Sequence, residues 1–201
     1  MEANKIIITG GATRIGAAIA RKLSGPKKEI LIHYNKSKSK AESLKKELEI
    51  NGTKVYLVKA DLSKETDVNK MVKFAKNIKG KNNNIINIID QRVFKLTPYF
   101  FSYTISKTGL YTLTKTSAMS LAPNVRVNGI APGPTIKNQR QTDKHFKKQY
   151  LATPLKRQVD VDQICNAVDF FIKNRSITGQ VLAIDSGQNL NWQTPDVIGK
   201  E

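Results

Sequence analysis

The chain has 201 residues, of which 39% are hydrophobic, a length and composition that suffice for one α/β domain with its own core. No apolar run approaches the roughly 20 residues of a membrane span, and the N-terminus lacks signal-peptide features, so we expect no membrane partner. The single cysteine, Cys165, excludes an internal disulfide and favours a cytoplasmic location. Two histidines and one cysteine form no metal cluster, and we expect no metal site.

The formal net charge of +18 admits two interpretations. Lysine-rich surfaces attract phosphate, which would indicate a nucleic-acid partner and a steeply salt-dependent affinity. The lysines, however, are scattered over predicted helix surfaces, without an arginine-rich arm or an aromatic RNA-binding strand. We therefore favour a solvated lysine-rich surface and expect no nucleic-acid partner.

Short apolar strands and amphipathic helices alternate along the chain, which is typical of a parallel sheet. In the first part, strands are expected at residues 6–8, 30–32 and 55–58. Helices follow them: one ends at Gly25-Pro26, one covers about 39–49, and one carries apolar residues from Val68 to Ile78 after a cap at Ser63.

The second part continues the alternation. Strands are expected at 85–89, 125–130 and 181–184, with a long helix over about 99–121. A loop runs from Pro132 to about Pro154, and an apolar stripe from Val161 to Ile172 predicts a further amphipathic helix. The whole order predicts a single domain over residues 1–201, with a Rossmann-type doubly wound parallel sheet and helices on both faces.

A glycine-rich turn directly follows the first strand and opens the first helix. It reads Thr-Gly-Gly-Ala-Thr-Arg-Ile-Gly over residues 9–16. Gly10 permits a tight turn and Gly16 lets the helix pack close to the strand, while the helix N-terminus offers N–H groups to a pyrophosphate. This context predicts a dinucleotide site.

Tyr103 and Lys107 stand four residues apart in the long helix, so they share one face. An ammonium near a phenol favours the phenolate and is expected to lower the pKa of Tyr103. Such a tyrosine can donate a proton to a carbonyl or imine while a nicotinamide delivers hydride.

Together, the turn and the Tyr-x-x-x-Lys pair resemble the short-chain dehydrogenase/reductase family, and the resemblance covers nearly the whole chain. It implies a cofactor contact at Ile15 beside Gly10 and Gly16, and a nicotinamide ribose anchor at Lys107. The loop after the fifth strand, with Pro132, Gly133 and Thr135, resembles the family's segment over the nicotinamide.

Two departures from the usual family pattern are similar to the pteridine reductase branch. Arg14 replaces a glycine, and Asp90 replaces the serine that normally stands thirteen residues before the catalytic tyrosine. The resemblance implies that Arg14 holds an NADPH phosphate and that Asp90 relays a proton to Tyr103. Gln91 and Arg92 are candidates for lining the entrance to the same site as Asp90, although Arg92 equally fits a surface ion pair.

The end of the second strand indicates which nicotinamide cofactor is bound. It reads His33-Tyr34-Asn35-Lys36-Ser37, without the acid that binds the ribose hydroxyls of NADH. Lys36, Ser37 and Arg14 can instead bind a 2′-phosphate, which favours NADPH. After the third strand, Asp61 and Leu62 resemble the family's adenine-binding edge.

One strand–helix unit of the family, which lies before the strand at 85–89, has no counterpart in the sequence. Such a unit takes roughly 30 residues. Three explanations remain open: residues missing from the printed sequence, a true deletion, or a rewired fold in which the strand at 85–89 closes up beside the first strand.

The sequence thus predicts an NADPH-dependent oxidoreductase that reduces a pterin or dihydropterin, and the resemblance implies a homo-oligomer. One alternative is a carbonyl reductase of the same family, of the 3-oxoacyl type. Another is a dinucleotide-binding protein that the missing unit has left inactive.

Overall fold

The computed structural model describes residues 4–76 and 83–192. They fall into two compact units, Met1–Asn83 and Asn84–Glu201. The single domain over 1–201 therefore stays a prediction, and each unit is described by itself. No helix in the described part of the chain is long and apolar enough to cross a membrane.

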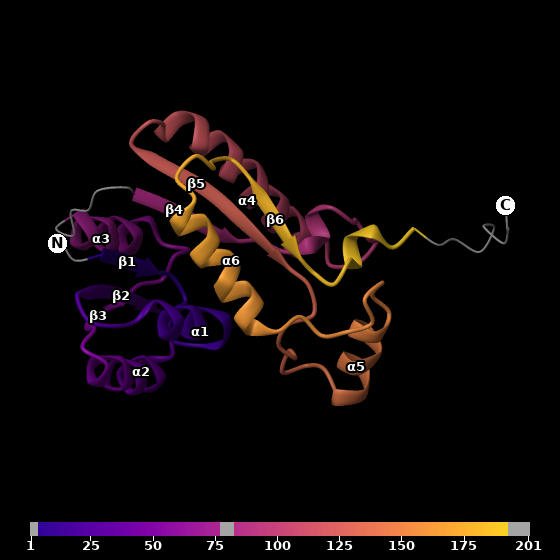
Figure 1. The fold of residues 1–201 in the computed structure, drawn as a ribbon, viewed down its shortest axis with the longest axis horizontal. Coiled ribbons are helices and arrows are strands. Elements are labelled where there is room, and N and C mark those ends of the chain that lie inside the picture. Colours follow the sequence, from indigo (N-terminus) through magenta and orange to yellow (C-terminus); the bar gives the residue numbers. More distant parts are fainter. Residues whose placement is uncertain (1–3, 77–82, 193–201) are drawn as a thin grey trace, which may run out of the picture. The chain divides into compact units, whose positions relative to one another are not determined.

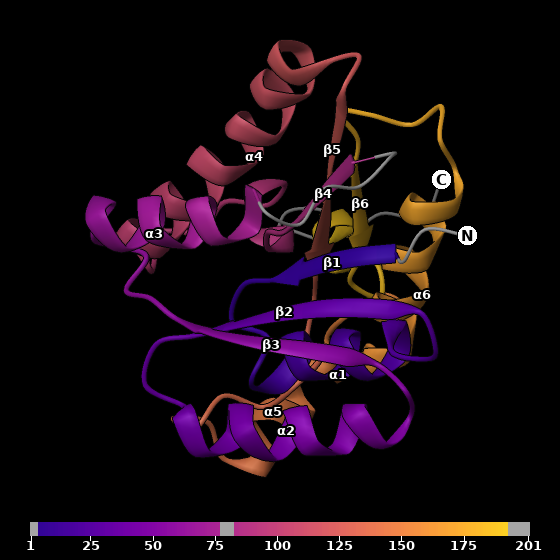
Figure 2. The same ribbon diagram turned by 90° about the vertical axis from the view of Figure 1, so that its left-hand side faces the viewer.

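The first unit is a three-stranded parallel sheet with strand order β1-β2-β3, shown side by side in Figure 2. Its elements are β1 (Asn4–Ile8), α1 (Arg14–Leu23), β2 (Lys28–Tyr34), α2 (Lys38–Ile50), β3 (Lys54–Lys59) and α3 (Glu65–Lys76). Ile30, Leu31 and Ile32 of the central strand are fully buried, because both faces of a parallel sheet are covered.

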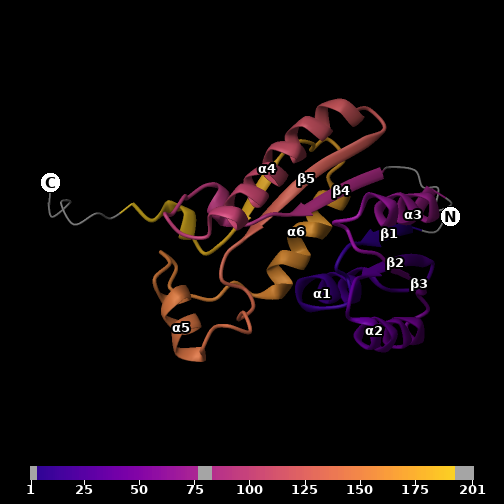
Figure 3. The same ribbon diagram turned by 180° about the vertical axis from the view of Figure 1, so that it is seen from behind.

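The second unit holds a sheet with strand order β4-β5-β6, in which β5 and β6 are parallel. Its elements are β4 (Asn83–Ile88), the 3₁₀ turn η1 (Gln91–Val93), α4 (Phe101–Leu121), β5 (Val125–Pro132), α5 (Asp143–Leu151), α6 (Val161–Lys173), β6 (Val181–Ile184) and η2 (Gln188–Leu190). Helices α4 and α6 cover opposite faces of this sheet (Figures 1 and 3). Between them lie the buried side chains of Val127, Ile130, Ile164 and Phe171.

Two glycines let the strands of the second unit approach closely. A Cβ at Gly129 would lie 2.7 Å from Ile89 Cδ1, and one at Gly133 would lie 2.6 Å from Asp185 Cα. Real Cβ contacts are not this short, so larger residues would push the end of β5 away from its neighbours. The fit keeps the loop after β5 against the end of β6.

The predicted fold class is confirmed: parallel sheets flanked by helices form a Rossmann-type α/β architecture. One expectation is wrong, because the predicted loop from Pro132 to Pro154 contains helix α5. Thr142 caps α5 by accepting from His145 N–H, and Phe146 anchors the helix in the core. With so few apolar residues, α5 has only a weak amphipathic pattern.

Two smaller corrections concern helix starts. The long helix begins at Phe101 rather than at 99, after Phe100 adopts a left-handed φ of 63°. Ser63 does not cap α3, because both its N–H and its hydroxyl donate to Asp61 Oδ1. The expected apolar position Ile78 lies outside the described residues.

Helix α3 ends at Lys76 and β4 begins at Asn83. Residues 77–82 between them lie outside the described residues, and the predicted loss of one strand–helix unit stays a prediction. In the described part, hydrogen bonding places β4 in the second sheet, beside β5.

Candidate active site

The glycine-rich turn between β1 and α1 has the shape that the sequence predicts. Gly10 has a φ of +63°, which favours glycine. A Cβ on Gly16 would collide with the carbonyl oxygen of Gly10, so the helix can approach the turn only with glycine there. The first amides of α1 have no partner further back in the helix and can receive a phosphate.

Arg14 opens α1 with a φ of 51°. Only glycine adopts this left-handed conformation without strain, so the structure explains why glycine is usual at this position of the turn. An arginine in such a place costs of order 1 kcal/mol, which favours a functional reason for its side chain.

His33 lies near the end of β2, as the sequence predicts, and its side chain is buried. Its ring is 4% exposed, Nδ1 accepts from Gly10 N–H at 3.0 Å, and Nε2 lies 3.0 Å from the Ala60 carbonyl oxygen. Both ring nitrogens are therefore used inside the protein. The direct cofactor contact predicted for His33 stays a prediction.

The remaining predicted cofactor residues of the first unit lie at the ends of β2 and β3. Lys36 is exposed, and Ser37 stands before α2 without a hydrogen bond from its side chain to the helix. The Ser63 hydroxyl, its N–H and the charges of Lys64 and Lys36 lower the pKa of Asp61, so this carboxylate is a ready acceptor. Leu62 is 45% exposed beside it.

The three predicted catalytic residues come together in the second unit. Tyr103 OH donates to Asp90 Oδ2 at 2.8 Å, and Lys107 Nζ lies 5.8 Å from the centre of the Tyr103 ring. Asp90 stands just after β4, where its Oδ1 accepts from Arg92 N–H at 2.8 Å and begins η1. The end of β4 and one face of α4 thus hold the Asp90 carboxylate and the Tyr103 phenol in contact.

The expected electrostatic effect of Lys107 is wrong. The pKa of Tyr103 is raised, mainly by burial and then by the charge of Asp90 and the hydrogen bond to it. The ammonium of Lys107 instead donates to the Ile88 carbonyl oxygen at 3.0 Å, and burial lowers its own pKa. Tyr103 is therefore a neutral phenol, suited to donating a proton rather than accepting one.

Sequence reasoning missed how the segment after Asp90 is held. The guanidinium of Arg92 stacks on the ring of Phe100 at 4.9 Å, and its Nη1 donates to Thr97 Oγ1 at 2.8 Å. Within residues 4–76 and 83–192, no ion pair of Arg92 is found, so the surface ion pair considered from sequence is not seen there. An Arg–Phe pair eight residues apart carries no recognisable local signal.

The segment predicted to contact the nicotinamide, residues 132–135, contains an internal hydrogen bond. Thr135 is 3% exposed, and its hydroxyl donates to the Gly133 carbonyl oxygen at 3.1 Å. Gly133 N–H donates to Ile184, and Pro132 ends β5. The structure thus brings Pro132, Gly133 and Thr135 together at the carboxyl end of β5, where ligands bind in open α/β sheets.

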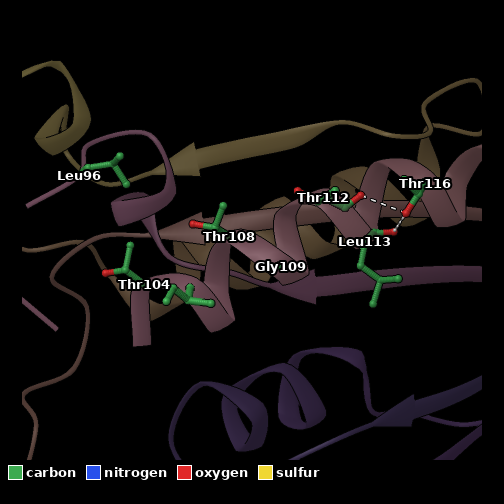
Figure 4. Close-up of a pocket in the computed structure, with 8 residues that line it drawn as sticks. Leu96, Thr104, Thr108, Gly109, Thr112, Leu113 and Thr116 are labelled. Carbon is green, nitrogen blue, oxygen red and sulfur yellow. Dashed lines mark hydrogen bonds between the residues drawn. The ribbon is translucent and has the colours of Figure 1, made fainter. Parts of the chain in front are cut away.

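A groove of about 710 Å³ follows the outer face of α4. Figure 4 shows Thr104, Thr108 and Thr112 along the helix, with Leu96 at one end. Its walls are mostly apolar, and Ile105 and Leu113 are 72% and 55% exposed. The described structure thus has exposed apolar side chains on this face of α4, whereas apolar side chains usually pack against other residues.

Two family models match the chain. A model described as short chain dehydrogenase matches residues 4–81, and one described as Enoyl-(Acyl carrier protein) reductase matches residues 71–189. The second covers more than half of the chain. The two matches overlap at residues 71–81.

Solved and curated proteins give a more detailed picture. The crystal structure of FolM Alternative dihydrofolate reductase 1 from Brucella canis, complexed with NADP, is similar with a TM-score of 0.90 and 35% identity, over 96% of this chain and 97% of that one. Dihydromonapterin reductase of Klebsiella pneumoniae is 32% identical over 107 residues, which are 53% of this chain and 44% of that protein.

The 3-oxoacyl-[acyl-carrier-protein] reductase FabG of Staphylococcus epidermidis is 25% identical over 236 positions, covering 90% of this chain and 97% of the reductase. This alignment is longer than the 201 residues of this chain, so the reductase contains segments without a counterpart here. The family models and the catalytic and glycine-rich motifs agree: the chain belongs to the short-chain dehydrogenase/reductase family.

Proposed function

We propose that this chain is an NADPH-dependent reductase of a pterin or dihydropterin. The observation that carries the proposal is the 2.8 Å contact between Tyr103 OH and Asp90 Oδ2, because a carboxyl group stands where the family usually has serine. Likeness to a FolM reductase crystallised with NADP and to a dihydromonapterin reductase supports both the cofactor and the substrate class.

Reduction of a C=N bond needs one hydride at carbon and one proton at nitrogen. NADPH, when bound, supplies the hydride. Tyr103 donates the proton, since its raised pKa keeps the phenol neutral. In the structure the single hydrogen of the Tyr103 hydroxyl lies in the bond to Asp90 Oδ2. For reduction, this hydrogen turns from the carboxylate to the substrate nitrogen, and Asp90 then passes a proton taken from solvent to the phenolate, which restores the phenol.

The residues of the first unit fit an NADPH molecule. The close packing of Gly16 against Gly10 places the first amides of α1 at the turn, where they suit the pyrophosphate. We assign the 2′-phosphate to Arg14, Lys36 and Ser37. The absence of an acid from the end of β2 supports this choice.

The adenine and nicotinamide contacts complete the proposed cofactor site. In the first unit, the adenine amine would donate to the Asp61 carboxylate, with Leu62 beside the ring. In the second unit, Lys107 would hold the nicotinamide ribose, and Gly133 with Pro132 and Thr135 would border the nicotinamide. The Thr135 hydroxyl already donates to the Gly133 carbonyl oxygen. We therefore assign the contact between Thr135 and the nicotinamide to the Thr135 backbone.

A carbonyl reductase of the 3-oxoacyl type is the second candidate. The likeness to FabG favours it. Asp90 argues against it, because a carboxylate beside the proton donor suits a basic ring nitrogen better than a ketone. An inactive dinucleotide-binding protein is the third candidate, supported by the missing strand–helix unit.

We further propose that the protein is a homo-oligomer that uses the outer face of α4. Ile105, Leu113 and Met119 are 72%, 55% and 73% exposed there, and exposed apolar patches of this kind mark protein interfaces. Sedimentation of the unaltered chain and of Leu113→Glu tests this: the variant should be smaller. A cytoplasmic location stays a proposal that rests on the single cysteine.

A substrate panel distinguishes the three candidate functions. NADPH oxidation by the purified chain is measured with a dihydropterin, with a 3-oxoacyl thioester and without substrate. Turnover of the dihydropterin that is lost in Tyr103→Phe supports the proposed reductase. Turnover of the thioester alone supports the second candidate, and saturable NADPH binding without turnover of either substrate supports the third.

A further inference from the structure

His33 links two loops that are far apart in sequence. Its Nδ1 accepts from Gly10 N–H at 3.0 Å, in the turn after β1, and its Nε2 lies 3.0 Å from the carbonyl oxygen of Ala60, just after β3. The backbone adds to this: Gly11 N–H donates to the His33 carbonyl oxygen at 3.1 Å, and Ala60 N–H donates to the Tyr34 carbonyl oxygen at 3.1 Å.

These partners determine the protonation state of the ring. A backbone N–H can only donate and a carbonyl oxygen can only accept, so Nδ1 must be the bare nitrogen and Nε2 must carry the hydrogen. His33 is thus a neutral imidazole in its Nε2–H form. Because the ring is 4% exposed and both nitrogens are engaged, it offers no polar atom to a ligand.

The two loops that His33 joins are the two ends of the proposed adenosine site. Gly10 lies in the turn that leads into α1. Its carbonyl oxygen lies so close to Gly16 that a Cβ at that residue would collide with it. Ala60 immediately precedes Asp61, the proposed adenine acceptor. A shift of the His33 ring would therefore move the phosphate end and the adenine end of the site relative to each other.

The same bonds determine which amides remain for a phosphate. Gly10 N–H donates to the His33 ring and Gly11 N–H donates to the His33 carbonyl oxygen, so both amides are already engaged within the protein. The pyrophosphate must instead rely on the first turn of α1. The glycines shape the turn without themselves supplying the N–H donors.

We propose that His33 is a positioning residue for the dinucleotide: in its neutral Nε2–H form it fixes the Gly10 turn and the Ala60-Asp61 edge at the spacing that the adenosine half requires. This inference rests on the proposed NADPH-binding function. It differs from an ordinary buried histidine, which would contribute to stability alone.

The chain offers a matched control at the other end of the same sheet. Thr53 is 3% exposed, and its hydroxyl accepts from Gly25 N–H at 2.7 Å and donates to the Gly25 carbonyl oxygen at 3.3 Å. It is likewise a buried side chain that bridges backbone groups. Thr53→Val removes that bridge without touching the proposed cofactor site.

The experiment compares His33→Leu, His33→Gln and Thr53→Val in the full chain. NADPH affinity is measured by fluorescence titration and stability by urea unfolding. His33→Leu should weaken NADPH binding at least about tenfold, since it leaves the Gly10 amide and the Ala60 carbonyl without their partner. His33→Gln, which can still accept and donate, should recover most of the affinity. Thr53→Val should lose stability and keep the NADPH affinity of the unaltered chain.

Two results would overturn the inference. One is an NADPH affinity in His33→Leu equal to that of the unaltered chain, or reduced no more than in Thr53→Val. The other comes from ¹⁵N NMR of the cofactor-free protein, where a charged or Nδ1–H imidazole at His33 would contradict the assigned tautomer. The NMR result does not depend on NADPH, whereas a failure of the unaltered chain to bind NADPH would refute the proposed function itself.

Discussion

Replacing Asp90 with asparagine separates the proton relay from the architecture around it. In the structure Oδ1 of Asp90 accepts from Arg92 N–H and Oδ2 accepts from Tyr103 OH. Asparagine keeps one acceptor for Arg92 N–H and is an equally good cap, so η1 should stay intact. Its amide group can donate to the phenol oxygen, but it cannot transfer a proton.

The size of the effect follows from the role of the lost group. A positioned acid or base contributes typically about 10²- to 10⁴-fold to the rate, which is about 3 to 5 kcal/mol in activation free energy. We therefore expect kcat for a dihydropterin to fall by at least about 10²-fold, while NADPH affinity and urea stability change little. The assay is steady-state NADPH oxidation, with fluorescence titration of NADPH in the same samples.

Asp90→Ser is the matched control, because it restores the residue that the family usually carries. It should lose dihydropterin reduction as well and gain relative activity toward a 3-oxoacyl thioester. A kcat for Asp90→Asn within threefold of that of the unaltered enzyme would show that Asp90 does not relay the proton.

Three further predictions test other parts of the structure. Gly16→Ala should weaken NADPH binding at least about tenfold, because the new Cβ meets the Gly10 carbonyl oxygen, whereas Gly109→Ala, with open space around it, should not; equal affinities would contradict the proposed turn. Arg126→Met should lower the free energy of urea unfolding by about 2 kcal/mol, since Nη1 of Arg126 donates to three backbone carbonyl oxygens between 171 and 177; an unchanged midpoint would refute that role. The folded pKa of Tyr103 lies above its unfolded value, so its contribution to stability is complete below about pH 10 and is lost as the pH rises through the folded pKa. Urea unfolding at pH 8 and pH 11 should therefore show a smaller alkaline loss in Tyr103→Phe than in the unaltered chain, and an equal loss would argue against a raised pKa.

Local patterns in the sequence predicted most of the architecture. The strand–turn–helix around Gly10 and the apolar periodicity of α1, α2 and α6 depend on neighbours within a few residues, and the structure agrees with them. Helix α5 was missed because its stability comes from the Thr142 cap and one buried ring, Phe146, rather than from an apolar stripe.

The candidate site was predictable in its members and less so in their interactions. Counting thirteen residues back from Tyr103 found Asp90, and the two are in contact. The effect of Lys107 was wrongly predicted, because helical spacing places it near the phenol but does not reveal that the Ile88 carbonyl oxygen takes its hydrogen. The contacts of His33 with Gly10 and Ala60 could not be predicted, because these residues lie on other segments that spacing alone does not bring together.

The most direct test of the proposed function is NADPH oxidation with a dihydropterin by the purified chain, its intact mass confirmed at 201 residues. We predict saturable turnover that disappears in Tyr103→Phe while NADPH binding persists. Saturable NADPH binding with no dihydropterin turnover by the unaltered chain would contradict the proposed reductase.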